Sequence, residues 1–226
     1  MANIGDESIV KKSFIHVTSR TPFVVSWLTA LGIEADKIID STVIAAKELY
    51  VPEMGRCGAP FLSQLNWLQD RMAMLYPNHN NPNNSTGGNS VVLIRRTRSR
   101  TVSNHMQVEN AVRSFSTARG LPFQVHSDDR LPSLVDQIQL FARARIVVAP
   151  HGAGELFVNF LPPNSCVVEL ISASNTCLAY SRIAYVKRMH YVQCYMDANH
   201  ANRVDEKELT AALEGCFRAV QETGKL

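Results

Sequence analysis

Short apolar strands alternate with amphipathic helices along the second half of the chain, and this pattern constrains the fold more than any other feature of the sequence. Strands are predicted at 91–95, 123–127, 145–149, 166–172 and 190–196. Helices are predicted at 104–120, 131–144, 176–189 and 205–223, with one more directly after residue 154. Such βαβ units cross over right-handedly, so the pattern predicts an α/β fold with a doubly wound parallel sheet. Asn104 is expected to cap the first of these helices.

The first part of the chain is less regular. Helices are predicted at 21–33, with Thr21 as N-cap and Pro22 at the first helical position, and at 62–75. Short strands are predicted at 12–19, 36–41 and 46–53. An Asn-, Pro- and Gly-rich stretch follows. We therefore expect three parts: a partial N-terminal α/β portion at 1–76, a linker at 77–90, and one domain at 91–226.

Composition excludes several classes of protein. A chain that is 46% hydrophobic and 19% charged buries a proper core, and a net charge of +3 is too mild to indicate a nucleic-acid partner. No window approaches the length of a membrane span, and the N-terminus lacks the apolar core of a signal peptide. The five cysteines include no CxxC pair, so neither a zinc site nor a disulfide framework is expected. Cys166 and Cys194 are interpreted as small buried hydrophobes.

The segment "RIVVAPHGAGELFVNFLPP", residues 145–163, places a histidine and a small-residue turn where a buried strand stops. Gly152, Ala153 and Gly154 would let a ligand approach the backbone, and the amides that open the next helix favour an anion such as phosphate. His151 would then donate a hydrogen bond or act as an acid or base. The alternative is a histidine that only caps the turn.

Two other groups follow predicted strands. Arg95, Arg96, Arg98 and Arg100 follow the strand at 91–95, and guanidinium groups match phosphate oxygens, so a pair of them would clamp a diphosphate. Arg96 and Arg100 are the best candidates, and a solvated basic loop is the alternative. Glu169 would accept hydrogen bonds from ribose hydroxyls or, alternatively, cap the next helix.

Familiar nucleotide motifs are missing from the sequence. It has no GxGxxG, no GK[ST] of a P-loop and no DxD-like metal motif, and "SDDR" at 127–130 is explained as a turn before a helix. A nucleoside-phosphate hydrolase or kinase is therefore disfavoured.

These residues, in this order, resemble glycosyltransferase family 61. The resemblance spans about residues 23 to 213; its most specific block is "HGAG" through "FLPP", supported by "ELYVP", "IRRTRSRTVSN" and "LPSLVDQIQLFARARIVVAP". It implies inverting, sugar-nucleotide-dependent enzymes with two Rossmann-like halves, the GT-B arrangement, of which residues 1–76 keep the last portion of the first. The chain departs from the family pattern at His105, Gln107, Glu155 and Phe157.

The resemblance implies a donor site and a partner set. The donor, a nucleotide sugar that we expect to be UDP-linked, would be held by Arg95, Arg96, Arg100, Asn104, His151, Gly152, Ala153, Gly154 and Glu169. The acceptor would be a glycan or glycoprotein, no metal or other cofactor is expected, and His151 is the candidate catalytic base. The alternative is an inactive nucleotide-sugar-binding module or fragment. The implied location is the lumen of the ER or Golgi for a longer eukaryotic member, and otherwise the cytoplasm.

Overall fold

The fold is built on one six-stranded sheet. The structure is a computed structural model that describes residues 7–51, 61–77, 88–172, 177–197 and 202–223. Its strands are β3 (Ser90–Arg95), β4 (Phe123–Ser127), β5 (Ala144–Pro150), β6 (Cys166–Ser172), β7 (His190–Asp197) and β8 (Arg203–Val204), in the order β4-β3-β5-β6-β7-β8. The first five in this order are parallel. Edge strand β8 runs antiparallel to β7, so the α/β class is confirmed but the sheet is mixed.

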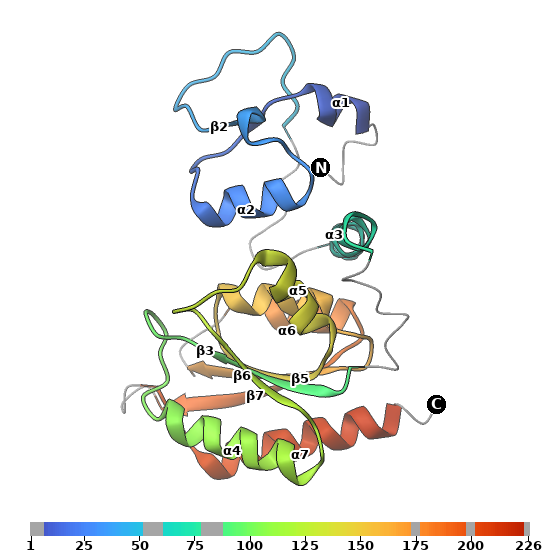
Figure 1. The fold of residues 1–226 in the computed structure, drawn as a ribbon. Helices are drawn as coiled ribbons and strands as arrows, with labels where there is room; N and C mark the ends of the chain where they lie inside the picture. The colour runs from blue at the N-terminus through green and yellow to red at the C-terminus, as the bar shows by residue number, and fades with distance from the viewer. Residues whose placement is uncertain (1–6, 52–60, 78–87, 173–176, 198–201, 224–226) are drawn as a thin grey trace.

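Helices cover both faces of this sheet (Figure 1). Helices α4 (His105–Ala118) and α7 (Glu206–Thr223) lie on one face, and α5 (Leu134–Ala142) and α6 (Ala179–Val186) lie on the other. Strand β3 shows why both faces need cover: Val91 and Leu93 belong to the core under α4 and α7, whereas Val92 and Ile94 belong to the core under α5. Because successive side chains of a strand point to opposite faces, a continuous apolar strand is buried on both sides.

The first part of the chain adds smaller elements. These are α1 (Glu7–Lys12), β1 (Ile15–His16), α2 (Pro22–Ala30), the 3-10 turn η1 (Ala35–Lys37), β2 (Ile38–Ile39) and α3 (Leu62–Leu75). Strands β1 and β2 pair in parallel, and the Thr21 hydroxyl caps α2 by accepting from the Val24 amide at 3.3 Å, as predicted. The strand predicted at 46–53 is wrong for residues 46–51, which form no strand, and its last two residues lie outside the described part.

Part of the first portion shares its core with the second. Met72 of α3 is fully buried and belongs to the same apolar cluster as Val147 of β5 and Phe157. The Asn159 side chain also donates to the Leu65 carbonyl oxygen at 3.2 Å. Ala30 of α2 belongs to the same cluster, and α2 packs against α5, so both α2 and α3 lie over the α5–α6 face of the sheet. The predicted linker lies mostly outside the described residues, since 78–87 are not described. No helix of the described segments has both the length and the apolar character needed to cross a membrane.

Two local expectations were wrong. Cys166 on β6 forms a disulfide with Cys216 on α7, fifty positions away, because α7 packs across β6 and brings the two buried residues together. Asn104 stands at the predicted N-cap position of α4, but its side chain does not cap the helix: its nitrogen donates to the Val204 carbonyl oxygen, and its oxygen accepts from the Val204 amide, both at 2.9 Å. Both contacts are long-range, so neither follows from local patterns. Cys194 is free and buried, as expected.

Candidate functional site

The sheet changes direction between β3 and β5. From β3 the chain continues to β4 on one side, and then returns to place β5 on the other side of β3. In open sheets of parallel strands, ligands bind at the carboxyl ends of the two strands that flank such a switch point. The arginine loop follows β3, and the turn at 151–154 follows β5. The two segments singled out from the sequence therefore meet where the topology predicts a binding site.

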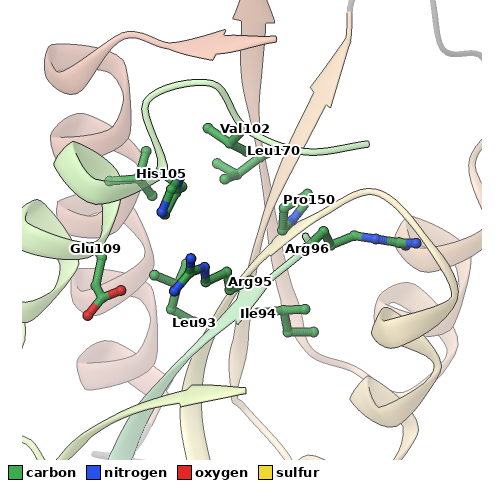
Figure 2. A pocket seen from close by; sticks show the side chains of 10 residues that line it. Leu93, Ile94, Arg95, Arg96, Val102, His105, Glu109, Pro150 and Leu170 are labelled. Atoms are coloured by element: carbon green, nitrogen blue, oxygen red, sulfur yellow. The ribbon is translucent and has the colours of Figure 1, made fainter. Parts of the chain in front are cut away.

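Arg95 and Arg96 point to opposite sides of the sheet (Figure 2). Arg95 extends toward His105 and Glu109 on α4, whereas Arg96 extends toward the other face. The divergence follows from the two-residue period of a strand, of which Arg95 is the last residue. Of the two, only Arg96 reaches the turn after β5, so the structure separates Arg95 from the rest of the expected donor site.

Arg96 and Arg100 converge on Gly152. A Cβ placed on Gly152 would lie 1.9 Å from Nη1 of Arg96 and 3.3 Å from Nη1 of Arg100. Nη1 of Arg100 also donates to the His151 carbonyl oxygen at 3.4 Å, and Nη2 of Arg96 donates to the Ser99 hydroxyl at 3.0 Å. Arg100 adopts a left-handed backbone conformation with φ 54°, which non-glycine residues take up at some cost and which is enriched at functional sites. Two features favour a glycine at 152: the guanidinium groups occupy the space of a side chain, and the backbone φ of 157° is one that other residues rarely adopt.

His151 belongs to a buried hydrogen-bonded chain. Its Nδ1 contacts Oε1 of Glu169, and the Tyr191 hydroxyl donates to Oε2 of the same carboxylate. The Tyr191 hydroxyl in turn accepts from Nε2 of Gln193 at 3.3 Å. Glu169 is 1% exposed and His151 is 7% exposed. Because both oxygens of Glu169 are engaged, its carboxylate is fixed against His151, as in sites where a carboxylate sets the tautomer of a catalytic histidine.

The turn after β5 is not the α-helix that the sequence predicts. Residues Ala153–Phe160 form a 3-10 helix, η2. The Gly152 amide donates to Oε2 of Glu155 at 3.1 Å, so the first amide expected to bind an anion is already occupied. The anion-binding capacity of this turn therefore depends on the arginine side chains beside it.

Glu155 is the functional candidate that the sequence reasoning missed. It is fully buried, and its Oε2 lies 3.9 Å from Nδ1 of His151. Burial, reinforced by the neighbouring Glu169 carboxylate, raises the pKa of Glu155 well above its usual range. Its Oε1 has no hydrogen-bond partner. The sequence held a signal, since an acid four residues after His151 in "HGAGE" follows a buried strand.

His151, Glu155 and Glu169 could also hold a cation. One ligand atom from each lies within 4.8 Å of the others, and an imidazole with two carboxylates is a donor set that suits divalent metals. The same atoms of His151 and Glu169 already bond to each other, and the Arg96 charge acts on Glu155. The expectation of a metal-free site stays a prediction.

The remaining predicted residues are placed as follows. Asn104 is buried, and its amide is engaged with Val204, away from any ligand in this conformation. Ala153 begins η2. Gly154 has no close clash, since a Cβ there would lie 3.5 Å from the Ile94 side chain. The glycine at 152 is thus explained without a ligand close to the backbone. At Gly154 there is room for a ligand to approach.

Solved structures show only distant similarity. A diflavin flavoprotein A3 from Nostoc sp. aligns with a TM-score of 0.40 at 11% identity, covering 60% of this chain and 99% of that one. A flavo di-iron protein from Thermotoga maritima aligns with a TM-score of 0.38 at 9% identity, covering 70% of this chain and 41% of that one. These similarities are too low to assign a common fold. No curated protein matches the sequence.

A family model gives the decisive match. The model for "Glycosyltransferase 61" matches residues 11–168, well over half of the 226 residues. The matched segment contains the arginine loop and the turn at 151–154, and it ends one residue before Glu169. Membership implies a nucleotide-sugar donor and a glycan acceptor. The chain therefore belongs to glycosyltransferase family 61 and is a glycosyltransferase.

Proposed function

We propose that the chain transfers a sugar, with inversion, from a UDP-linked donor to a hydroxyl of a glycan or glycoprotein, using a Rossmann-like donor half of the GT-B type. The observation that carries the proposal is the convergence of Arg96 and Arg100 on Gly152, beside the buried His151–Glu169 pair. Two cations next to a histidine held by a carboxylate supply what the reaction needs: charge stabilisation for a leaving diphosphate and a base for the acceptor.

The arginines act on the leaving group. As the bond between the anomeric carbon and the diphosphate oxygen breaks, negative charge grows on the diphosphate. Guanidinium groups already positioned beside Gly152 stabilise that charge most strongly in the transition state, which is the condition for catalysis. In the proposal this role needs no metal. Arg95, which points toward α4, takes no direct part in it.

His151 acts as the base. With Nδ1–H bound to Glu169, the lone pair of the imidazole lies on Nε2. Nε2 accepts the proton of the acceptor hydroxyl while its oxygen forms the new bond to the anomeric carbon. Glu169 stabilises the imidazolium that results and keeps the ring oriented, so it is a positioning residue rather than a ligand for ribose.

The disulfide supports an oxidising compartment. Cys166 and Cys216 pair between buried positions of β6 and α7. Disulfides persist in secreted and ER-lumenal proteins and are rare in reducing compartments. We therefore favour the lumen of the secretory pathway over the cytoplasm.

Separating binding from chemistry tests the proposal. His151→Ala should keep UDP affinity, measured by calorimetry, and lose donor turnover, measured as UDP release from a UDP-sugar. Arg96→Ala should lose affinity, and Arg98→Ala is the matched control because Arg98 is an exposed arginine of the same loop. A binding module without turnover would bind UDP and release none in any variant. Equal donor turnover in the wild type and His151→Ala would remove His151 as the base.

A further inference from the structure

A pocket that the arguments above do not use opens beside Arg96. Its volume is about 510 Å³, and it lies between α2, the carboxyl ends of β3 and β4, and the start of α5. Its walls include Phe23, Trp27, Arg96, His126, Leu131 and Phe157. The aromatic rings form a continuous surface, since Trp27 stacks on Phe157 at 5.9 Å between ring centroids. Phe23 and Leu131 remain 54% and 57% exposed at this pocket.

Two residues that line the pocket carry a buried side-chain N–H without a hydrogen-bond partner, Nε1 of Trp27 and Nε of Arg96. Nε of Arg96 forms an ion pair at 4.0 Å with Oδ2 of Asp128, which also lines the pocket. Trp27 and Arg96 come from α2 and from the loop after β3, two parts of the chain far apart in sequence. A buried N–H without an acceptor costs free energy, and each such group in a native protein calls for an explanation. Both atoms are enclosed in this conformation, so what the pocket itself offers a ligand is aromatic surface beside the charges of Arg96 and Asp128.

The position of the pocket relative to His151 restricts which ligand this is. Helix η2 packs against both α5 and α6 and so lies between them. The pocket is on the α5 side, whereas the His151 ring contacts Tyr180 of α6 at 5.2 Å between ring centroids. Arg96 lies between these two sides, because it lines the pocket and also packs on Gly152. A donor with its diphosphate at Arg96 and its sugar at His151 can extend its nucleoside into the pocket, because Arg96 borders both sides.

We infer that this pocket binds the nucleobase of the donor, with the base packed against Phe23, which is exposed, and Trp27, which is half-buried. The inference rests on the proposed function, because it takes the diphosphate to lie at Arg96. A base has a flat apolar face on which aromatic side chains pack. Uracil, guanine and adenine all offer such a face, so the aromatic surface of the pocket is expected to accept UDP, GDP and ADP.

The experiment compares ligands that share the diphosphate and differ in the base. The chain has two tryptophans, so Trp67→Phe leaves Trp27 as the single tryptophan. This reporter chain is titrated with UDP, GDP, ADP and inorganic pyrophosphate. All three nucleotides should change the Trp27 emission, whereas pyrophosphate, which has no base, should not. Phe23→Ala should weaken UDP about tenfold and leave pyrophosphate unchanged, since stacking on the base is the contact removed.

Control variants distinguish a failure of the nucleobase pocket from a failure of the diphosphate site. Phe14→Ala removes a phenylalanine that is 65% exposed and does not line the pocket, so it should change the affinity for neither UDP nor pyrophosphate. Leu131→Ala is a second pocket variant that should repeat the Phe23→Ala pattern. If UDP and pyrophosphate both bind, but Phe23→Ala and Leu131→Ala bind UDP as tightly as the wild type does, the inference about the nucleobase is wrong. The proposed diphosphate site at Arg96 is then not affected. A Trp27 response to free monosaccharides, without nucleotide, would instead make the pocket an acceptor site. If neither UDP nor pyrophosphate binds, both the inference and the proposed donor site are wrong.

Discussion

Adding one methyl group at Gly152 should disable the donor site. The Cβ of Gly152→Ala would lie 1.9 Å from Nη1 of Arg96 and 3.0 Å from its Cζ, so the guanidinium must leave its position. The end of an arginine moves easily, because it is flexible and Arg96 is partly exposed. The backbone at Gly152 is a separate cost, since its φ of 157° is one that alanine rarely adopts, so Gly152→Ala should also lower the melting temperature. UDP affinity is therefore compared at a temperature at which both chains are folded. The loss falls on the anion that Arg96 is positioned to bind.

The magnitude follows from the contact that is lost. A hydrogen bond to a charged group contributes about 1.5–3 kcal/mol, which corresponds to roughly 10- to 150-fold in affinity. UDP affinity, measured by titration calorimetry, should fall by that factor in Gly152→Ala. Gly154→Ala is the matched control, since its Cβ would meet the Ile94 side chain at an ordinary 3.5 Å. It should bind UDP within about threefold of the wild type.

A double-mutant cycle identifies the cause. If Gly152→Ala acts through Arg96, it should have no further effect in a chain that already carries Arg96→Ala. Additive losses would show that the methyl group blocks the ligand itself, as expected if the glycine served only for close ligand approach. Wild-type affinity in Gly152→Ala would refute the placement of Arg96 in the donor site.

Three further predictions concern the buried cluster and the disulfide. Glu169→Gln should lower kcat by about 100-fold while leaving the Kd for UDP unchanged, because it removes the charge that stabilises the His151 imidazolium; an equal loss of affinity would place Glu169 on the donor instead. The raised pKa of Glu155 means that the folded chain holds this proton more tightly than the unfolded chain does, so stability falls as pH rises from the ordinary glutamate pKa, about 4.3, through the raised value. The free energy of unfolding of Glu155→Gln, measured by urea denaturation, should thus equal that of the wild type near pH 4 and exceed it by a growing amount toward pH 8. A difference in unfolding free energy that shrinks as pH rises would contradict this expectation. Replacing Cys166 and Cys216 by alanine should cost about 4 kcal/mol of unfolding free energy for a separation of 50 residues, with unfolding then independent of reductant; an unchanged urea midpoint would show that the disulfide does not stabilise the fold.

The sequence predicts the parts of this protein that depend on local patterns. The strands from β3 to β7 and the helices between them follow from apolar period and turn residues. The placement of Arg96 and His151 at one edge follows in turn from parallel strand order. The family resemblance, based on the same segments, is confirmed by the family match.

Long-range contacts account for what the sequence could not show. The Asn104–Val204 hydrogen bonds and the Cys166–Cys216 disulfide join residues whose proximity is decided by how α4 and α7 pack. Gly152 leaves room for the Arg96 guanidinium only because the Arg96 side chain lies on that face of the sheet. A shift of one residue in the strand would place the side chain on the opposite face. Glu155 was overlooked because an acid after a glycine turn is typical of a solvated helix start, and only the packing shows that it is fully buried.

Calorimetric titration of the intact chain with UDP, GDP and a panel of UDP-sugars tests the central claim most directly, first with chelator and then with Mn²⁺. The donor site at Arg96 predicts saturable binding of UDP that chelator leaves unchanged, that Arg96→Ala weakens at least about tenfold, and that Arg98→Ala preserves. Binding that appears only with Mn²⁺ would indicate instead that a cation at His151, Glu155 and Glu169 carries the diphosphate. Absence of binding to every nucleotide would contradict the donor site itself.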